Sequence, residues 1–156
     1  MFNQEYNYCR VTFARHGIPE GVLPDIGPGL SFLSYMEPGD TSQVFIGFIT
    51  RLLNRTKRSA LHEMVHTLIE RFPLTEGERS IFGTADEWEA DQSFIRGFMR
   101  SGKHLNFYAG THPEEDFVET ACALLQERST PVHYVVKKRA ITAWLRRVKR
   151  EAQAYA

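Results

Sequence analysis

The sequence has little of what would build a disulfide framework, a membrane span or a strongly charged surface. Cys9 and Cys122 are the two cysteines in 156 residues. They lie far apart without metal-ligand spacing, so we expect both to be reduced thiols. No apolar run approaches the roughly 20 residues that cross a bilayer. Basic and acidic residues number 19 each, so the formal net charge is zero and no global field favours nucleic acid or an anionic membrane.

The first six residues, Met1 to Tyr6, lack the basic and apolar regions of a secretory signal. This absence predicts a cytoplasmic protein. The length predicts one domain over residues 1–156, which is large enough to bury a core without covalent cross-links. We therefore expect an ordinary soluble globule whose function depends on a local site.

One stretch, residues 59–69, contains the motif H-E-x-x-H at His62, Glu63 and His66. Histidines four residues apart lie one turn apart on a helix, so both imidazoles can bind one metal ion. The carboxylate of Glu63 can reach a metal-activated water and take its proton. Apolar residues at helical spacing predict that the stretch is a helix with a buried face: Leu61, Val65, Leu68, Ile69 and Phe72.

An accidental motif is the alternative, since a histidine on an apolar helix is commonly a packed core residue. Composition alone gives a chance match an expectation of roughly one or two per cent in this chain, and helical context lowers it. The motif therefore favours a metal site, which requires a third ligand elsewhere in the chain.

A second stretch, residues 108–120, supplies candidates for that ligand. Pro113 suits the first turn of a helix, and acidic residues fill that turn. A helical glutamate would complete a two-histidine site and leave the fourth position for water. Glu115, Asp116 and Glu119 are candidates, whereas Glu114 is expected to be a solvated first-turn charge. Glu115 and Glu119 lie one turn apart on one face, so Glu119 can instead accept the second N–H of a ligating histidine.

Together the two stretches resemble the gluzincin-type zinc-binding metallopeptidases. That group has H-E-x-x-H, then a Phe-Gly region with downstream acids, then Y-A-x-x-H-P-x-E-D-[FW]-x-E-T. Residues 82–87 and 108–120 match these in order. Lethal-factor-like peptidases and Pro-Pro endopeptidases have a similar arrangement, with a tyrosine seven residues before the ligand glutamate, and Tyr108 and Glu115 keep that spacing. The resemblance covers roughly the middle and C-terminal two-thirds of the chain by motif matching.

The resemblance implies a site and an activity. One Zn²⁺ ion per chain would be bound by His62, His66 and Glu115. Glu63 would be the general base and Tyr108 the hydrogen-bond donor to the tetrahedral intermediate. The implied function is zinc-dependent hydrolysis of peptide bonds in a peptide or protein substrate. For Tyr108 the alternative is a core aromatic.

Two other functions stay open. The chain could be a zinc-binding regulatory module that docks nucleic acid or an acidic partner through the basic segment 137–150, or a metal-free structural protein. We expect that segment to be the solvated face of a packed helix, with neither nucleic acid nor membrane as a partner.

The pattern predicts an α+β fold, a minimal zincin-like domain. A small N-terminal antiparallel sheet, from a strand at 8–13 and a hairpin at 30–36 and 43–49, would pack on the H-E-x-x-H helix. Three further helices are expected at 85–100, from 113 and from 130 onward, with a surface loop at 74–84. Predicted apolar contacts of these helices include Trp88, Phe94, Ile95, Phe98, Val132, Val135, Val136 and Trp144.

Overall fold

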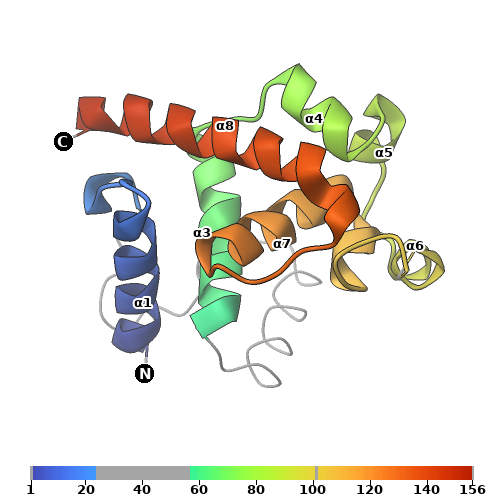
Figure 1. Ribbon diagram of the computed structural model, residues 1–156, viewed down its shortest axis with the longest axis horizontal. Helices are drawn as coiled ribbons and strands as arrows, with labels where there is room; N and C mark the ends of the chain where they lie inside the picture. Colours follow the sequence, from blue (N-terminus) through green and yellow to red (C-terminus); the bar gives the residue numbers. More distant parts are fainter. Residues whose placement is uncertain (1, 24–56, 101, 156) are drawn as a thin grey trace.

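A computed structural model describes residues 2–23, 57–100 and 102–155, and every regular element in these ranges is a helix. Figure 1 shows their arrangement. The α-helices are α1 (Phe2–Arg15), α3 (Lys57–Arg71), α4 (Glu76–Phe82), α5 (Ala85–Glu89), α6 (Phe94–Met99), α7 (Pro113–Leu125) and α8 (Val135–Ala152). The 3₁₀ helices are η1 (Glu20–Val22), η3 (Tyr108–Thr111), η4 (Val132–Tyr134) and η5 (Gln153–Tyr155). None of these helices is long and apolar enough to cross a membrane.

The core forms where α3 packs against α1 and α7 and where α8 packs on α7 (Figure 1). The ring of Trp144 in α8 packs edge-on against Phe117 in α7, with centroids 5.2 Å apart, and its indole N–H donates to the carbonyl of Phe72 at 2.8 Å. The ring of Trp144 is therefore packed against apolar side chains, and its one polar group has a hydrogen-bond partner. Fully buried side chains around it include Leu61, Val65, Leu68, Val118, Ile141 and Val148.

The predicted α+β class is wrong, because the expected strand at 8–13 lies inside α1. Cys9, Thr12 and Phe13 are buried whereas Val11 is 43% exposed, which is helical and not alternating spacing. The short window of β-branched and aromatic residues is overridden by packing of this face on α3. The predicted strands at 30–36 and 43–49 lie outside the described residues.

The helix predicted around H-E-x-x-H is confirmed, and α3 ends at Arg71, just before Pro73. The helix predicted from Pro113 is confirmed as α7. His112 caps it: its Nδ1 accepts the backbone N–H of Glu114 at 3.0 Å, and its Nε2 lies 3.1 Å from the carbonyl of Trp88. His112 therefore fixes the start of α7 against α5.

The loop predicted at 74–84 is wrong, since this segment contains α4. Thr75 and Glu78 form a capping box, in which each side chain accepts the other's backbone N–H. The Glu78 carboxylate also accepts two hydrogen bonds from Arg147 of α8, both at 2.8 Å. A short polar segment becomes helical because both its cap and its tertiary contact stabilise it.

The single helix predicted at 85–100 is also wrong, because the chain breaks it into α5 and α6. A second capping box, of Thr84 and Glu87, starts α5, and Ser93 starts α6 by accepting the backbone N–H of Arg96. Because the chain turns between α5 and α6, the apolar residues of the two helices do not share one buried face, as they would on a single helix. Ile95 and Phe98, predicted as core contacts, are 74% and 71% exposed.

The predicted last helix is present as α8, but it begins at Val135 after η4. Trp144 is buried as expected, and Ala140 and Val148 on the same side of the helix are buried with it. Val132, Val135 and Val136 were expected on the same apolar side, yet all three are exposed. The buried stripe therefore starts about two turns later than the sequence pattern suggested.

Candidate metal centre

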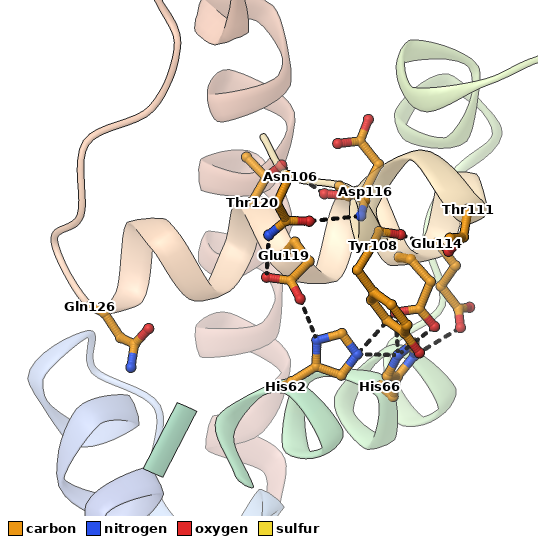
Figure 2. A network of polar contacts seen from close by, with 12 residues as sticks. His62, His66, Asn106, Tyr108, Thr111, Glu114, Asp116, Glu119, Thr120 and Gln126 are labelled. Atoms are coloured by element: carbon orange, nitrogen blue, oxygen red, sulfur yellow. Dashed lines mark hydrogen bonds and ion pairs between the residues drawn. The ribbon is translucent and has the colours of Figure 1, made fainter. Parts of the chain in front are cut away.

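The centre is built where α3 crosses α7, which brings together side chains from distant parts of the chain (Figure 2). His62 and His66 come from α3, and Glu115 comes from the first turn of α7. The His62 Nε2 lies 3.1 Å from the His66 Nε2 and 2.9 Å from Glu115 Oε2. The His66 Nε2 lies 3.1 Å from Glu115 Oε1. Three potential ligand atoms thus converge on one point.

This group could hold a metal ion. For metal–ligand bonds of about 2.0–2.2 Å, atoms at tetrahedral corners lie about 3.3–3.6 Å apart, only a few tenths of an ångström more than the separations here. Two imidazoles and a carboxylate also form a donor set that suits divalent transition metals. Both the spacing and the chemistry of the donors therefore fit a metal.

The other nitrogen of each imidazole faces a carboxylate. The Nδ1 of His62 lies 3.3 Å from Glu119 Oε1, and the Nδ1 of His66 donates to Glu114 Oε2 at 2.9 Å. With the Nδ1 protons held in this way, the Nε2 lone pairs can point to the centre. The prediction placed Glu119 in such a role. It expected Glu114 to be a solvated first-turn charge, and Glu114 is a first-turn acid with a 39% exposed side chain, but it also pairs with His66.

Asp116 lies next to Glu115 in the sequence but takes no part in the centre. Its carboxylate is buried, and it accepts hydrogen bonds from the Lys137 ammonium and the Tyr134 hydroxyl. It therefore ties α7 to the start of α8. Successive residues on a helix point about 100° apart, so Glu115 and Asp116 face different neighbours.

The electrostatics of the centre favour positive charge on the histidines and negative charge on Glu115. Burial lowers the pKa of His62, but hydrogen bonds with Glu115 and Glu119 outweigh it and raise the pKa to about 9. The pKa of His66 is raised as well, because the effects of Glu115 and Glu114 outweigh burial. Burial raises the pKa of Glu115, yet His66 and His62 bring it well below its usual value. A cation at this centre would replace the protons held there.

Tyr108 lies beside the centre on η3. Its ring is edge-on to the His62 ring with centroids 5.5 Å apart, and its side chain is hydrogen-bonded to Gln92. Burial and the charge of Glu115 raise its pKa, so its hydroxyl keeps its proton at neutral pH. Tyr108 is only partly buried. It is therefore placed to offer a hydrogen-bond donor near the converging ligand atoms.

Glu63 is partly buried on α3, between the two histidines in sequence. Its negative charge contributes to the raised pKa values of both His66 and Tyr108. A charge acts on another more strongly the nearer it lies, so this carboxylate belongs to the charged surroundings of the centre. Glu63 follows His62 directly in α3 and is not among the three converging ligands.

Sequence reasoning missed Asn106, which links the two halves of the centre. Its Nδ2 donates to Glu119 Oε2 at 3.3 Å, while its Oδ1 accepts the backbone N–H of Ala109 at 2.8 Å (Figure 2). Asn106 thereby connects the carboxylate behind His62 to the turn that carries Tyr108. The one local signal was an asparagine just before that turn, where such side chains commonly bond the backbone.

No protein-family model, curated protein or solved structure matches this chain. Support for a function therefore comes from the residues of the centre and their surroundings.

Proposed function

We propose that this protein is a zinc-dependent metallopeptidase of the gluzincin type. His62, His66 and Glu115 would bind the zinc ion, Glu63 would be the general base, and Tyr108 would stabilise the oxyanion. The observation that carries the proposal is the convergence of two imidazole nitrogens and one carboxylate within 3.2 Å of one another. The carboxylates behind both imidazoles add to it, because ligating histidines commonly have such partners.

Zinc suits this donor set better than calcium or magnesium, which prefer oxygen ligands. Three protein ligands also leave one position for water or substrate, as catalytic zinc requires. When bound, zinc supplies Lewis acidity that acidifies water and polarises a peptide carbonyl. The remaining chemistry belongs to the side chains around the ligands.

Glu63 carries the proton in the proposed reaction. Its carboxylate takes a proton from the attacking water as the new carbon–oxygen bond forms, and passes this proton to the amine nitrogen as the peptide bond breaks. The reaction therefore consumes one water, and Glu63 ends as it began. A partly buried carboxylate close to the ligands is suited to both transfers.

Tyr108 provides the donor to the carbonyl oxygen. Negative charge develops on that oxygen during attack, and a hydroxyl that stays protonated stabilises it by a hydrogen bond. The contacts of Asn106 and Gln92 hold η3 and the tyrosine side chain, so the donor is positioned before substrate arrives. Tyr108→Phe would remove the donor and keep most of the ring's packing.

The decisive variant is Glu63→Gln. We expect it to bind zinc in the same amount as the native chain, because Glu63 is not a ligand, and to lose at least about a hundredfold in hydrolysis, because the base is gone. Zinc content is measured by elemental analysis. Hydrolysis is measured by digestion of a proteome-derived peptide library, with cleaved ends identified by mass spectrometry.

Glu115→Ala provides the matched comparison, since it should lower the zinc content itself. Full zinc loading of Glu115→Ala would remove that residue from the ligand set. Equal cleavage by the native and Glu63→Gln proteins would refute the proposed mechanism, and absence of zinc from the native protein would refute the proposed metal.

A further inference from the structure

The outward face of α8 carries a dense row of positive charge. Lys138, Arg139, Arg146, Lys149 and Arg150 fall with Val135 and Thr142 within about 120° of arc at 3.6 residues per turn. The buried residues Ala140, Trp144 and Val148 lie on the opposite side of the helix. We refer to the five cations as the α8 cationic stripe. It faces away from the buried side of the helix, and only at its far end does a member, Lys149, lie against another segment of the described chain, at Gly17.

The ion pairs of α8 lie on its inner side. Lys137 pairs with the buried Asp116, and Arg147 pairs with Glu78 at 2.8 Å. The hydrogen bond with Glu78 raises the pKa of Arg147, and the charge of Glu151, the one acid of α8, adds to this. Within the described ranges no ion pair is formed by any member of the stripe. The inner cations thus have internal counter-charges, whereas the outer ones have none among the described residues.

The stripe also borders a hollow in the surface. An open groove of about 370 Å³ is lined, among the residues that the structure describes, by Val135, Lys138, Arg139, Thr142 and Arg146. A water molecule takes about 30 Å³ in the liquid, so the groove has room for a group much larger than water. Its lining offers an ammonium, two guanidiniums and a hydroxyl, which are donors that bind phosphate oxygens.

Contrary to the expectation from the sequence that nucleic acid is not a partner, we infer that the α8 cationic stripe binds the phosphate backbone of nucleic acid, without regard to base sequence. From Lys138 to Arg150 the stripe is about 18 Å long, and duplex DNA presents one negative charge per about 1.7 Å of its axis. Several cations can therefore meet phosphates at once. The zero net charge of the chain does not oppose this, since phosphate contacts depend on local charge at these distances.

An anionic membrane is the competing partner, and the orientation of α8 disfavours it. A helix that binds a bilayer surface inserts its apolar face between the lipids. In α8 that face is already buried in the core, with Trp144 and Ile141 fully covered. The exposed valines lie only at its first turn. The stripe therefore offers charge with little apolar area beside it, as suits a phosphate backbone.

The test measures binding of the full chain to a fluorescent DNA duplex by anisotropy at several salt concentrations. Four cations on phosphates give an expected slope of log affinity against log salt of about −3 to −4. Combining Lys138→Gln, Arg139→Gln and Arg146→Gln should weaken binding at least about tenfold at low salt and flatten the slope by about two to three. The control combines Arg10→Gln, Arg79→Gln and Lys103→Gln, which removes the same charge elsewhere and should bind as the native chain does.

Thermal melting followed by circular dichroism checks that each variant is folded. A second variant, Arg139→Lys with Arg146→Lys, keeps the charge and should keep binding. Native-like affinity of the stripe variant would overturn the inference, as would binding that is indifferent to salt. So would binding of the native chain to phosphatidylserine vesicles with none to DNA. The inference does not depend on peptidase activity, because Glu63→Gln should bind DNA normally.

Discussion

At the scale of single residues, the function of each acid in α7 depends on the direction of its side chain. Glu115 contacts the two histidines, and Asp116 pairs with Lys137. Glu114 and Glu119 lie behind the outer nitrogens of the histidines (Figure 2). The four carboxylates lie within two turns but have three different environments: one is at the converging ligand atoms, two are behind the histidines, and one is in an ion pair with a lysine. Their chemistry depends on which neighbour each one meets.

Replacing Glu114 by alanine tests the carboxylate behind His66. The Nδ1 of His66 would lose its partner, so the imidazole would be less basic and less well oriented, and we expect zinc affinity to fall about 10–100-fold. Affinity is measured by competition with a chromophoric chelator. Glu76→Ala is the matched control, because Glu76 is also an exposed acid in the first turn of a helix and should leave the affinity unchanged. An equal effect of both changes would attribute the loss to helix charge alone.

Much of the site could be predicted residue by residue. The H-E-x-x-H spacing placed His62 and His66 together because helix geometry is local. The choice of Glu115 over Asp116 depended on a resemblance, since sequence spacing allowed both. Glu114 and Asn106 could not be foreseen, because their roles require α7 and η3 to be docked on α3.

At the scale of elements, helices with strong local signals were predicted and short ones were not. Pro73 and Pro113 mark the end of α3 and the start of α7. The capping boxes at Thr75 and Thr84 are equally local, and reading them would have found α4 and α5. The error at α1 is of another kind: six residues with alternating polarity suit either structure, and burial against α3 decides between them.

The contact between α6 and η3 makes a prediction for Gly97. A Cβ added there would lie 2.8 Å from both the Phe107 carbonyl oxygen and the Thr111 Cγ2, which is too close. Gly97→Ala should therefore push α6 and η3 apart and destabilise the fold by about 1–3 kcal/mol. Gly102→Ala is the control, because a Cβ at Gly102 meets nothing within 4 Å.

Chemical denaturation measures both free energies of unfolding. Because η3 carries Tyr108, Gly97→Ala should also lower the proposed peptidase turnover more than the content of the proposed zinc ion. If Gly97→Ala were as stable as Gly102→Ala, the close contact between these helices would be contradicted.

At the scale of the whole molecule, the centre joins segments 49 residues apart in the chain, as His66 and Glu115 are. An ion bound by both α3 and α7 binds the folded state and not the unfolded chain, so it must stabilise the fold. At a free zinc concentration a hundred times Kd, the gain is about 2.7 kcal/mol, which corresponds to a rise in Tm of about 5–10 °C for a chain of this size.

Thermal melting with and without zinc measures this rise, and Glu63→Gln should show it in full. His66→Ala, which lacks a ligand, should show little of it; an equal rise in His66→Ala would place the ion elsewhere.

The same measurement should depend on pH. The pKa of His62 is raised to about 9, so zinc must displace a proton below that pH. For each displaced proton, lowering the pH by one unit weakens apparent zinc binding about tenfold. The rise in Tm should therefore be smaller at pH 6 than at pH 8.

In the metal-free protein the protonated His62 stabilises the fold fully below a pH of about 6.5. This contribution is lost as the pH rises through about 9.

The sequence by itself determined the parts of this protein that depend on neighbouring residues: the α3 helix with its paired histidines, the start of α7 at Pro113, and the cationic composition of α8. Helical spacing, proline geometry and charge are properties of short segments, so they can be read without the fold. Only the tertiary structure decided that α1 is a helix, that Glu114 supports His66 and that two of the α8 cations are neutralised inside. These outcomes depend on contacts between segments far apart in the chain, and burial against a distant partner can outweigh any local preference.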